Sequence, residues 1–429
     1  MTNRMDADSG RPSPSKRSLL GLDGLNFLMA DVRDGVGPFL SVYLKGSQHW
    51  PAGPIGIAMA ANSFAAAISQ IPAGLVVDAF RAKRALVAGS GLLVALGCLV
   101  IALFPGFTLV VGAQLMLGAA SAVIPPVLAA LSLGLVGRKL FPARVSRNEG
   151  FNHAGNFSAA LLAGMVGQWL GYHWIFYLVC IFALGSAVVV CLIKPREIDH
   201  ELARGGESGG GENKPGEPKR AMPFRDLFRK RDLRVFLASV ILFHFGNAAM
   251  LPMAGQVLAK AHPGADISAL SACIIAAQLV MVGIAAAVGW ALRRGVGRKT
   301  IFLVALAVLP IRGLLFSFTD NPVGVVAIQL LDGVAAGIFG VIAVVIAADL
   351  MRGTGRFNLA QGLVAFSVGV GAALSNLTAG FVVQAFGYPA GFLTLSAVAV
   401  CAFTFFALFM PETRPDATWA GNLEASATA

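Results

Sequence analysis

The residues of this chain most able to do chemistry are ionisable side chains within long apolar stretches. Asp31, Arg33 and Asp34 lie in one such stretch, residues 19–44. On a helix Asp31 and Asp34 share a face, because they are three positions apart. Two carboxylates so close in a medium of low dielectric constant repel each other unless one holds a proton, or unless Arg33, another helix, a cation or a bound molecule compensates. This pattern predicts a site that binds a proton or another cation; the alternative is an ion pair that ties the stretch to a neighbour.

A second ionisable pair lies later in the chain. Arg312 and Asp332 belong to consecutive apolar stretches, residues 299–318 and 322–350, at similar depths from the turn that joins them. We expect the two side chains to pair, either as a structural salt bridge or as part of an outer gate or ligand contact. Uncharged polar residues of other apolar stretches are candidates for the lining of a cavity, or else polar groups satisfied by helix packing: Asn26, Gln114, His153, Asn156, His244, Asn247 and Gln278.

Other kinds of chemistry have no visible site. The sequence has no phosphate-binding loop with its Lys and Ser or Thr, no cluster of metal-ligand residues and no nucleophile with a neighbouring base. The five cysteines lie inside apolar stretches without paired spacing, and we interpret them as packing residues. We therefore expect no enzyme, no metal and no cofactor.

The elements that hold these side chains are predicted from composition. Hydrophobic residues make up 56% of the chain and charged residues 13%, against about 25% charged residues in soluble domains. A helix that crosses a bilayer needs about 20 apolar residues. Stretches of this kind are residues 19–44, 54–77, 85–104, 107–136, 149–170 and 173–194, and then 235–258, 268–292, 299–318, 322–350, 358–385 and 388–410. The sequence therefore predicts an all-α polytopic membrane protein with twelve transmembrane helices.

The basic residues are distributed asymmetrically along the chain. The net charge is +11, and most of the 33 Lys and Arg residues lie in alternate loops, the central linker and the tails. Basic loops stay on the cytoplasmic side of a membrane, so we expect both termini there, in a bacterial-type cytoplasmic (plasma) membrane, and no nucleic-acid partner. The predicted parts are an N-terminal tail (1–18), a six-helix bundle (19–194), a linker with an interfacial helix (195–234), a second six-helix bundle (235–410) and a C-terminal tail (411–429).

The two halves of the chain repeat each other. Gln114 and Gly118 correspond to Gln329 and Gly333, 215 residues later, and residues 163–176 correspond to residues 379–392 at an offset of 216. Two parallel repeats predict bundles related by a pseudo-twofold axis, with a binding site between them near the bilayer midplane. The acids of the first stretch are not part of the repeat. The positions that correspond to Asp31, Arg33 and Asp34 hold Gly246, Ala248 and Ala249.

This architecture resembles the major facilitator superfamily over residues 19–410. That family has a cytoplasmic loop between its second and third spans with a glycine, an acid four positions later and a basic cluster, and a related loop in the second half. The matching residues here are Gly74, Asp78, Arg81, Lys83 and Arg84, and then Gly289, Arg298 and Lys299. The resemblance implies a cytoplasmic gate loop in which Asp78 caps or pairs with a neighbouring helix end; the alternative is anchoring by positive charge alone. The first loop lacks the glycine of the basic cluster, and the second lacks the acid.

Two signatures of the family's proton-coupled exporters are altered. Gln114 stands where such exporters often have arginine, and Ala159 and Ala160 stand where they often have Gly-Pro. The resemblance implies a secondary active transporter that works by alternating access, and the acids of the first span favour proton-coupled export (efflux) of a small organic or amphiphilic compound. The altered signatures favour the alternative, a symporter or facilitator for uptake of a nutrient or anion; a non-transporting membrane receptor or sensor is an alternative of another class. The expected partners are a small-molecule substrate, protons or another coupling ion, and the lipid bilayer, and we expect a monomer.

Overall fold

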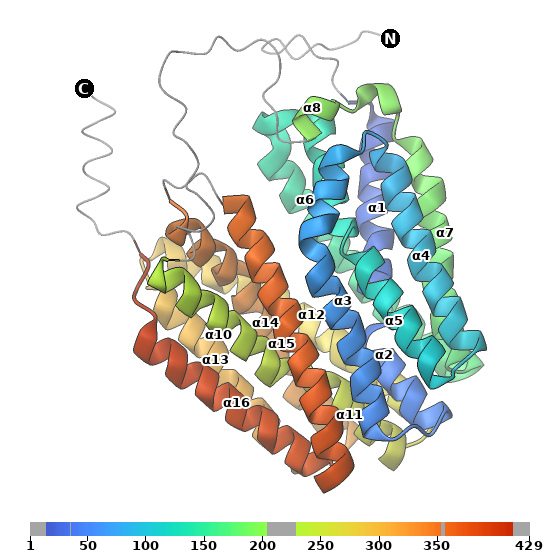
Figure 1. Cartoon of the computed structure of the whole chain (residues 1–429), viewed down its shortest axis with the longest axis vertical. Helices are drawn as coiled ribbons and strands as arrows, with labels where there is room; N and C mark the ends of the chain where they lie inside the picture. Colours follow the sequence, from blue (N-terminus) through green and yellow to red (C-terminus); the bar gives the residue numbers. More distant parts are fainter. Residues whose placement is uncertain (1–13, 35, 204–228, 353–356, 415–429) are drawn as a thin grey trace.

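The chain folds into long helices. A computed structural model describes residues 14–34, 36–203, 229–352 and 357–414, and these residues form helices and connecting turns, without strands (Figure 1). The first half contains α1 (Lys16–Asp34), α2 (Gly37–Val42), α3 (Ala52–Ala79), α4 (Lys83–Leu103), α5 (Phe107–Ser121), α6 (Ile124–Leu170), α7 (His173–Val189) and α8 (His200–Ala203). The second half contains α10 (Arg231–Asn247), α11 (Met250–Ala261), α12 (Asp266–Arg293), α13 (Arg298–Phe316), α14 (Pro322–Leu350), α15 (Phe357–Phe386) and α16 (Tyr388–Phe409). The predicted all-α class is confirmed.

Ten helical segments of the described residues are long and apolar enough to cross a membrane. The other two predicted spans are helical but differ in form. Residues 19–44 form α1 and α2, which are interrupted and carry several charges, and residues 149–170 are the more polar last part of α6. α6 joins the fourth and fifth spans without a loop, and it is kinked at Gly137, whose positive φ of 75° suits glycine. All twelve predicted spans therefore correspond to helices.

The linker between the halves is described in part. Its first residues lie on the first half, because the backbone amide of Asp199 donates to the carbonyl of Gly134 on α6 at 2.9 Å. Residues 204–228, which include the first part of the predicted interfacial helix, lie outside the described residues. Residues 231–234, assigned to the linker from the sequence, form the first turn of α10.

The first span of each half is broken at corresponding positions, between α1 and α2 and between α10 and α11. In the first half Gly37 has a φ of 42°, and Pro38 in the first turn of α2 has no N–H group that needs a partner. In the second half the freed amide of Ala249 donates to Oγ of Ser375 on α15 at 3.0 Å. Backbone groups freed at membrane depth are costly unless protein or water satisfies them. Gly37 and Pro38 therefore permit the first break, and Ser375 satisfies a backbone group that the second break frees.

The two halves pack against each other on one side of the molecule. α3 packs against α15, α6 against α12 and α2 against α11 (Figure 1). A Cβ on Gly56 of α3 would lie 2.8 Å from Cα of Gly380 on α15, whereas a Cβ on Gly74 or Gly362 of the same helices would meet no atom within 4 Å. The halves therefore diverge toward the ends that carry Lys16 and Arg414. We call that side, which the sequence predicts to be cytoplasmic, the inner side, and the opposite side the outer side.

The close approach of α3 and α15 leads to a first prediction. A methyl group added by Gly56→Ala would lie 2.5 Å from the carbonyl oxygen of Asn376, and overpacking of this kind costs about 1–3 kcal/mol. We expect Gly56→Ala to lower the thermal unfolding midpoint of the detergent-purified protein by several degrees, measured by scanning fluorimetry. Gly74→Ala is the matched control, because it adds the same methyl group to the same helix in open space. A similar loss of stability in both variants would contradict the packing described here.

Candidate functional site

The inner helix of the broken first span ends in charged residues. Asp31 and Arg33 lie in the last turn of α1 and are half-buried; the side chain of Asp34 lies outside the described residues. The unpaired carbonyl groups at the C-terminal end of a helix attract positive charge, so Arg33 is favourably placed. Irregular backbone at membrane depth occurs where it is buried in protein or lines a cavity. The structure therefore places the predicted coupling residues beside a break within the first span.

Arg312 on α13 is held by side chains of two other helices. Its Nη1 donates to Oδ1 of Asp332 at 2.8 Å and to Oδ1 of Asn247, and its Nη2 donates to Oε1 of Gln329 at 2.8 Å. Nε2 of Gln329 donates in turn to the second carboxylate oxygen of Asp332 at 2.9 Å. The side chain of Arg312 is 1% exposed and that of Asp332 is 18% exposed. A buried guanidinium needs compensation of its charge and donors. This cluster supplies the counter-charge and accepts from Nη1 and Nη2, whereas Nε of Arg312 has no hydrogen-bond partner among the described residues, and Asp332 stays partly accessible.

Gln329 is a member of this cluster that sequence reasoning did not select as a site residue. Its signal was the repeat, because Gln329 corresponds to Gln114. Gln114 is also buried, and its backbone carbonyl accepts a hydrogen bond from Nδ2 of Asn62 at 3.4 Å. The same glutamine position thus supports a charge cluster in the second half and a helix contact in the first.

Among the other uncharged polar residues expected to line a cavity, two form hydrogen bonds within their own helices. Asn26 is buried, and its Nδ2 donates to a carbonyl of its own helix at 2.7 Å. Nδ1 of His244 lies 3.0 Å from the carbonyl of Val240, and its ring packs edge-on against Phe339 with the centroids 4.7 Å apart. Asn156 on α6 is half-buried. Asn26 and His244 are thus satisfied within their own helices, as polar groups of helix packing often are, and a role in a cavity stays a prediction.

His153 and Gln278 join the two halves. Nδ1 of His153 on α6 lies 3.0 Å from Oε1 of Gln278 on α12, within hydrogen-bond distance. Further toward the inner side of the same helices, a Cβ on Gly150 or Gly283 would meet no atom within 4 Å. The pair therefore lies where α6 and α12 begin to diverge.

Glutamine side chains from both halves cross the outer part of the interface. The backbone amide of Gly53 donates to Oε1 of Gln384 at 2.9 Å, and Nε2 of Gln168 donates to the carbonyl of Gly264. Gln168 and Gln384 are corresponding residues of the repeat, and each contacts the opposite half, but their partners do not correspond: Gln384 accepts a hydrogen bond and Gln168 donates one. Sequence reasoning matched these glutamines but gave them no role, because the repeat does not show which residues face the other half.

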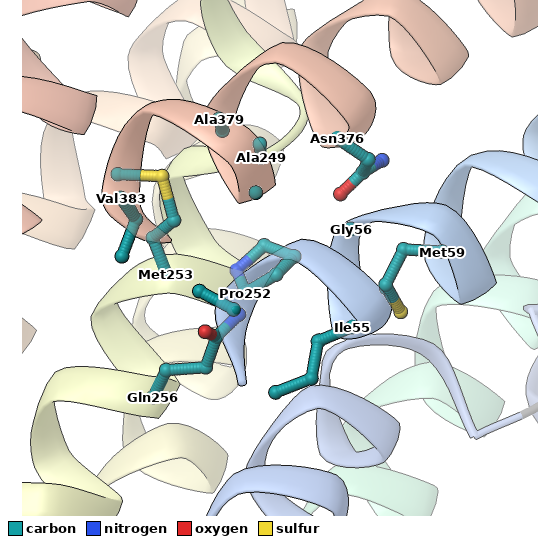
Figure 2. A pocket seen from close by; sticks show the side chains of 12 residues that line it. Ile55, Gly56, Met59, Ala249, Pro252, Met253, Gln256, Asn376, Ala379 and Val383 are labelled. Carbon is teal, nitrogen blue, oxygen red and sulfur yellow. The ribbon is translucent and has the colours of Figure 1, made fainter. Parts of the chain in front are cut away.

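Figure 2 shows the small cavity that remains in the outer part of this interface. Residues of α3, α11 and α15 line it, among them Gly56, Gln256 and Asn376. Its volume is about 10 Å³, which is space for roughly one water molecule. The interface is therefore too tightly packed here to hold a solute, while the inner ends of the same helices lie apart.

The first predicted gate loop makes contacts within its own half. Nζ of Lys83 donates to the carbonyl of Val77, and Nε of Arg84 donates to the carbonyl of Val190 at 3.1 Å. Arg81 and Asp78 are exposed, and in the described part of the chain Asp78 takes part in no hydrogen bond or ion pair. The predicted contact of Asp78 with a neighbouring helix end is absent from this arrangement of the described residues and stays a prediction.

The second predicted gate loop, which begins after Gly289, is closed by acids from elsewhere in its half. Nε of Arg298 lies 3.2 Å from Oδ2 of Asp349. The backbone amides of Arg298 and Lys299 donate to the carboxylate of Glu412 at 2.9 and 3.1 Å. Glu412 therefore caps the N-terminal end of α13, where a negative charge is favourable, and it provides the acid that this loop lacks.

Asp23 near the inner end of α1 forms a buried network with α6. Its two carboxylate oxygens accept hydrogen bonds from Arg144 at 2.6 Å and from Arg147 at 2.7 Å. Nε of Arg144 also donates to Oδ1 of Asn148 at 2.7 Å, and Nδ2 of Asn148 donates to Oγ of Ser132 at 2.8 Å. The hydrogen bond to the Asp23 carboxylate, together with its negative charge, raises the pKa of Arg147. The sequence did not indicate Asp23 as the partner of these two arginines.

Comparisons with known proteins find the same architecture. The family model described as Major Facilitator Superfamily matches residues 23–323 and 236–428. Relatives from two strains of Mycobacterium tuberculosis, each described as an uncharacterized MFS-type transporter, are 44% identical over 397 residues, which cover 91% of this chain and 93% of the relative. Among solved structures, the nucleoside transporter NupG gives a TM-score of 0.71 at 16% identity, covering 92% of this chain and 99% of that one. A D-xylose-proton symporter gives 0.68 at 14% identity, covering 93% and 98%. These likenesses confirm the predicted fold of two six-helix bundles.

The Arg312 cluster leads to a second prediction. Asp332→Asn would leave a buried guanidinium without its counter-charge, and breaking a buried pair in this way costs about 3–5 kcal/mol. We expect the variant to unfold at a clearly lower temperature, measured by scanning fluorimetry in detergent. Arg312→Met combined with Asp332→Asn removes both charges and should recover part of the loss.

The control for this prediction is Asp320→Asn, which removes an exposed acid from the turn before α14 and should change nothing. If Asp332→Asn is as stable as the unmodified protein, the pair does not stabilise the fold, and a role of Asp332 in ligand contact becomes the better interpretation.

Proposed function

The chain belongs to the Major Facilitator Superfamily, a family of transporters and not of enzymes, and from this premise we propose that it exports a small organic or amphiphilic compound in exchange for protons. The observation that carries the proposal is a charged break in the first span, between halves that are closed on the outer side and apart on the inner side. A secondary transporter alternates access by moving one bundle against the other around a central site. This arrangement has the form of the inward-facing state of such a cycle.

The proposed movement opens the outer interface. The contacts of α3 with α15 and of α6 with α12 must separate, which includes the hydrogen bond between Gly53 and Gln384 and the one between Gln168 and Gly264. The inner ends near Gly74 and Gly362 would then approach each other. Because both glutamine contacts join the outer parts of the two halves, one rotation that separates the halves there breaks both.

The proposed coupling site is Asp31, Asp34 and Arg33. In the inward-facing state the carboxylates release a proton to the inner side, which leaves a negative charge that Arg33 partly compensates, and the compound to be exported binds in this state. Protonation from the outer side then removes that charge and favours release. The close spacing of the two acids supports this role, because mutual repulsion makes the proton affinity of one depend on the charge of the other.

Uptake by a symporter or facilitator is the alternative within the family. It is supported by Gln114, which is buried where proton-coupled exporters often have arginine. The cluster of Arg312, Asn247 and Asp332 would then be a candidate contact for a polar solute, since Asp332 is partly exposed.

We further propose a location and an orientation. The basic loops and tails support a cytoplasmic membrane with both termini on the cytoplasmic side. Residues 19–194 and 235–410 would act as the two moving bundles, joined by the linker 195–234, and a monomer suffices because the proposed path lies within one chain.

The coupling proposal leads to a third prediction, tested with purified protein in liposomes. Candidate compounds are screened for flux with and without an imposed pH gradient, and the variants Asp31→Asn and Asp34→Asn are then compared with Asp320→Asn. We expect either variant of the first span to lower gradient-driven flux at least about tenfold, the equivalent of roughly 1.4 kcal/mol, and to flatten its pH dependence. Exchange of the compound without a gradient should persist.

Two outcomes would contradict the proposal. If flux and its pH dependence survive both substitutions, these acids are not the coupling site. If a pH gradient with the more acidic solution on the outer side drives uptake of the compound together with protons instead of its export, the uptake alternative is correct.

A further inference from the structure

A groove at the inner end of the first half has no role in the proposed cycle. One wall is a single face of α1, with Lys16, Leu19, Leu20 and Asp23 at helical spacing. The other wall comes from α6, with Val136 before its kink at Gly137 and Leu140, Ala143, Arg144 and Arg147 after it. The volume between these walls is about 450 Å³.

The groove combines apolar walls with a basic rim. Leu20 is 63% exposed and Leu140 is 50% exposed, so large apolar side chains are accessible at the inner ends of α1 and α6. Lys16 is the first residue of α1, at the side that the sequence predicts to be cytoplasmic. Apolar side chains beside basic ones at this depth are suited to acyl chains and anionic headgroups.

The charges of the rim do not cancel. Asp23 is the acid of the groove, and its side chain is 4% exposed because Arg144 and Arg147 both bind it. Two arginines and Lys16 against this one carboxylate leave a net positive charge. The side chain of Arg147 is 59% exposed, and among the described residues its Nη1 donates no hydrogen bond. Arg147 therefore keeps a donor for an anion, while Asp23 and the ring of Phe151, whose centroid lies 5.4 Å from the guanidinium carbon, hold the side chain in place.

We infer that this groove binds one anionic phospholipid of the inner leaflet. The phosphate lies against Arg147 and Lys16, and an acyl chain lies along Leu19, Leu140 and Ala143. A guanidinium is suited to phosphate because its donors match the phosphate oxygens. The inference does not depend on the substrate, the direction or the coupling of transport.

The experiment is native mass spectrometry of the detergent-purified full chain, titrated with phosphatidylglycerol or with phosphatidylcholine of the same acyl chains. We expect a first bound phosphatidylglycerol of distinctly higher affinity than phosphatidylcholine. Arg147→Gln should weaken it about fivefold, as removal of one basic residue near an anionic lipid does. Ala143→Leu narrows the groove without a change of charge and should weaken both lipids.

The control is Arg293→Gln, which removes an exposed arginine at the inner end of α12, outside the groove, and should leave binding unchanged. Arg147→Gln keeps the contact of Arg144 with Asp23, so its unfolding temperature without lipid serves as the check on folding. The inference is overturned if both lipids bind equally, or if Arg147→Gln and Ala143→Leu both bind phosphatidylglycerol like the unmodified protein. It is also overturned if a photo-crosslinker at position 143 captures residues 204–228 of the chain or a transported compound instead of lipid.

Discussion

The structure depends on one constraint: the interior of a bilayer offers no water to charged side chains or to freed backbone groups, so the protein must satisfy them itself. Arg312 meets most of this constraint through Asn247, Gln329 and Asp332, which lie on two other helices and bind its two terminal nitrogens. The break of the seventh span meets it through the hydroxyl of Ser375. Because buried charges and freed backbone groups are costly, we interpret their presence within the spans as a sign of a role beyond helix packing.

The duplicated scaffold and the charges follow different rules. Small residues and glutamines repeat between the halves and shape the close contacts at the outer interface, where Gln168 and Gln384 both reach the opposite half. The charges do not repeat: the first-half positions that correspond to Arg312 and Asp332 hold Gly97 and Leu117. A symmetric frame therefore carries an asymmetric set of ionisable groups, the acids of the first span in one half and the Arg312 cluster in the other. This division agrees with the proposed function, in which the duplicated helices move and the ionisable groups bind the transported compound and the coupling ion.

Much of the fold could be predicted from the sequence, because the length of the spans, the charge of the loops and the repeat can each be determined from the order of residues alone. The family resemblance drawn from these features is confirmed by the family match. The pairing of Arg312 with Asp332 could be predicted, because the depth of a residue in a span can be counted along the sequence. The contacts of Arg312 with Asn247 and Gln329 could not be predicted, since they depend on the rotation of three helices about their axes. The partnership of Asp23 with Arg144 was hidden for a similar reason, because 121 residues separate the two. The break at Ala249 gives no local signal either, since a serine on another helix satisfies it.

We propose that the halves rock about a central site, so that the outer interface opens as the inner ends approach each other, and that the charge at Asp31 biases this movement. The most direct measurement is a pair of distance distributions by pulsed electron resonance, with spin labels at positions 74 and 362 on the inner side and at positions 49 and 263 on the outer side, in a chain whose own cysteines are replaced. The account predicts that a change of pH shortens one distance while it lengthens the other, and that Asp31→Asn removes this response. Distances that change in the same direction, or a response that persists in Asp31→Asn, would contradict it.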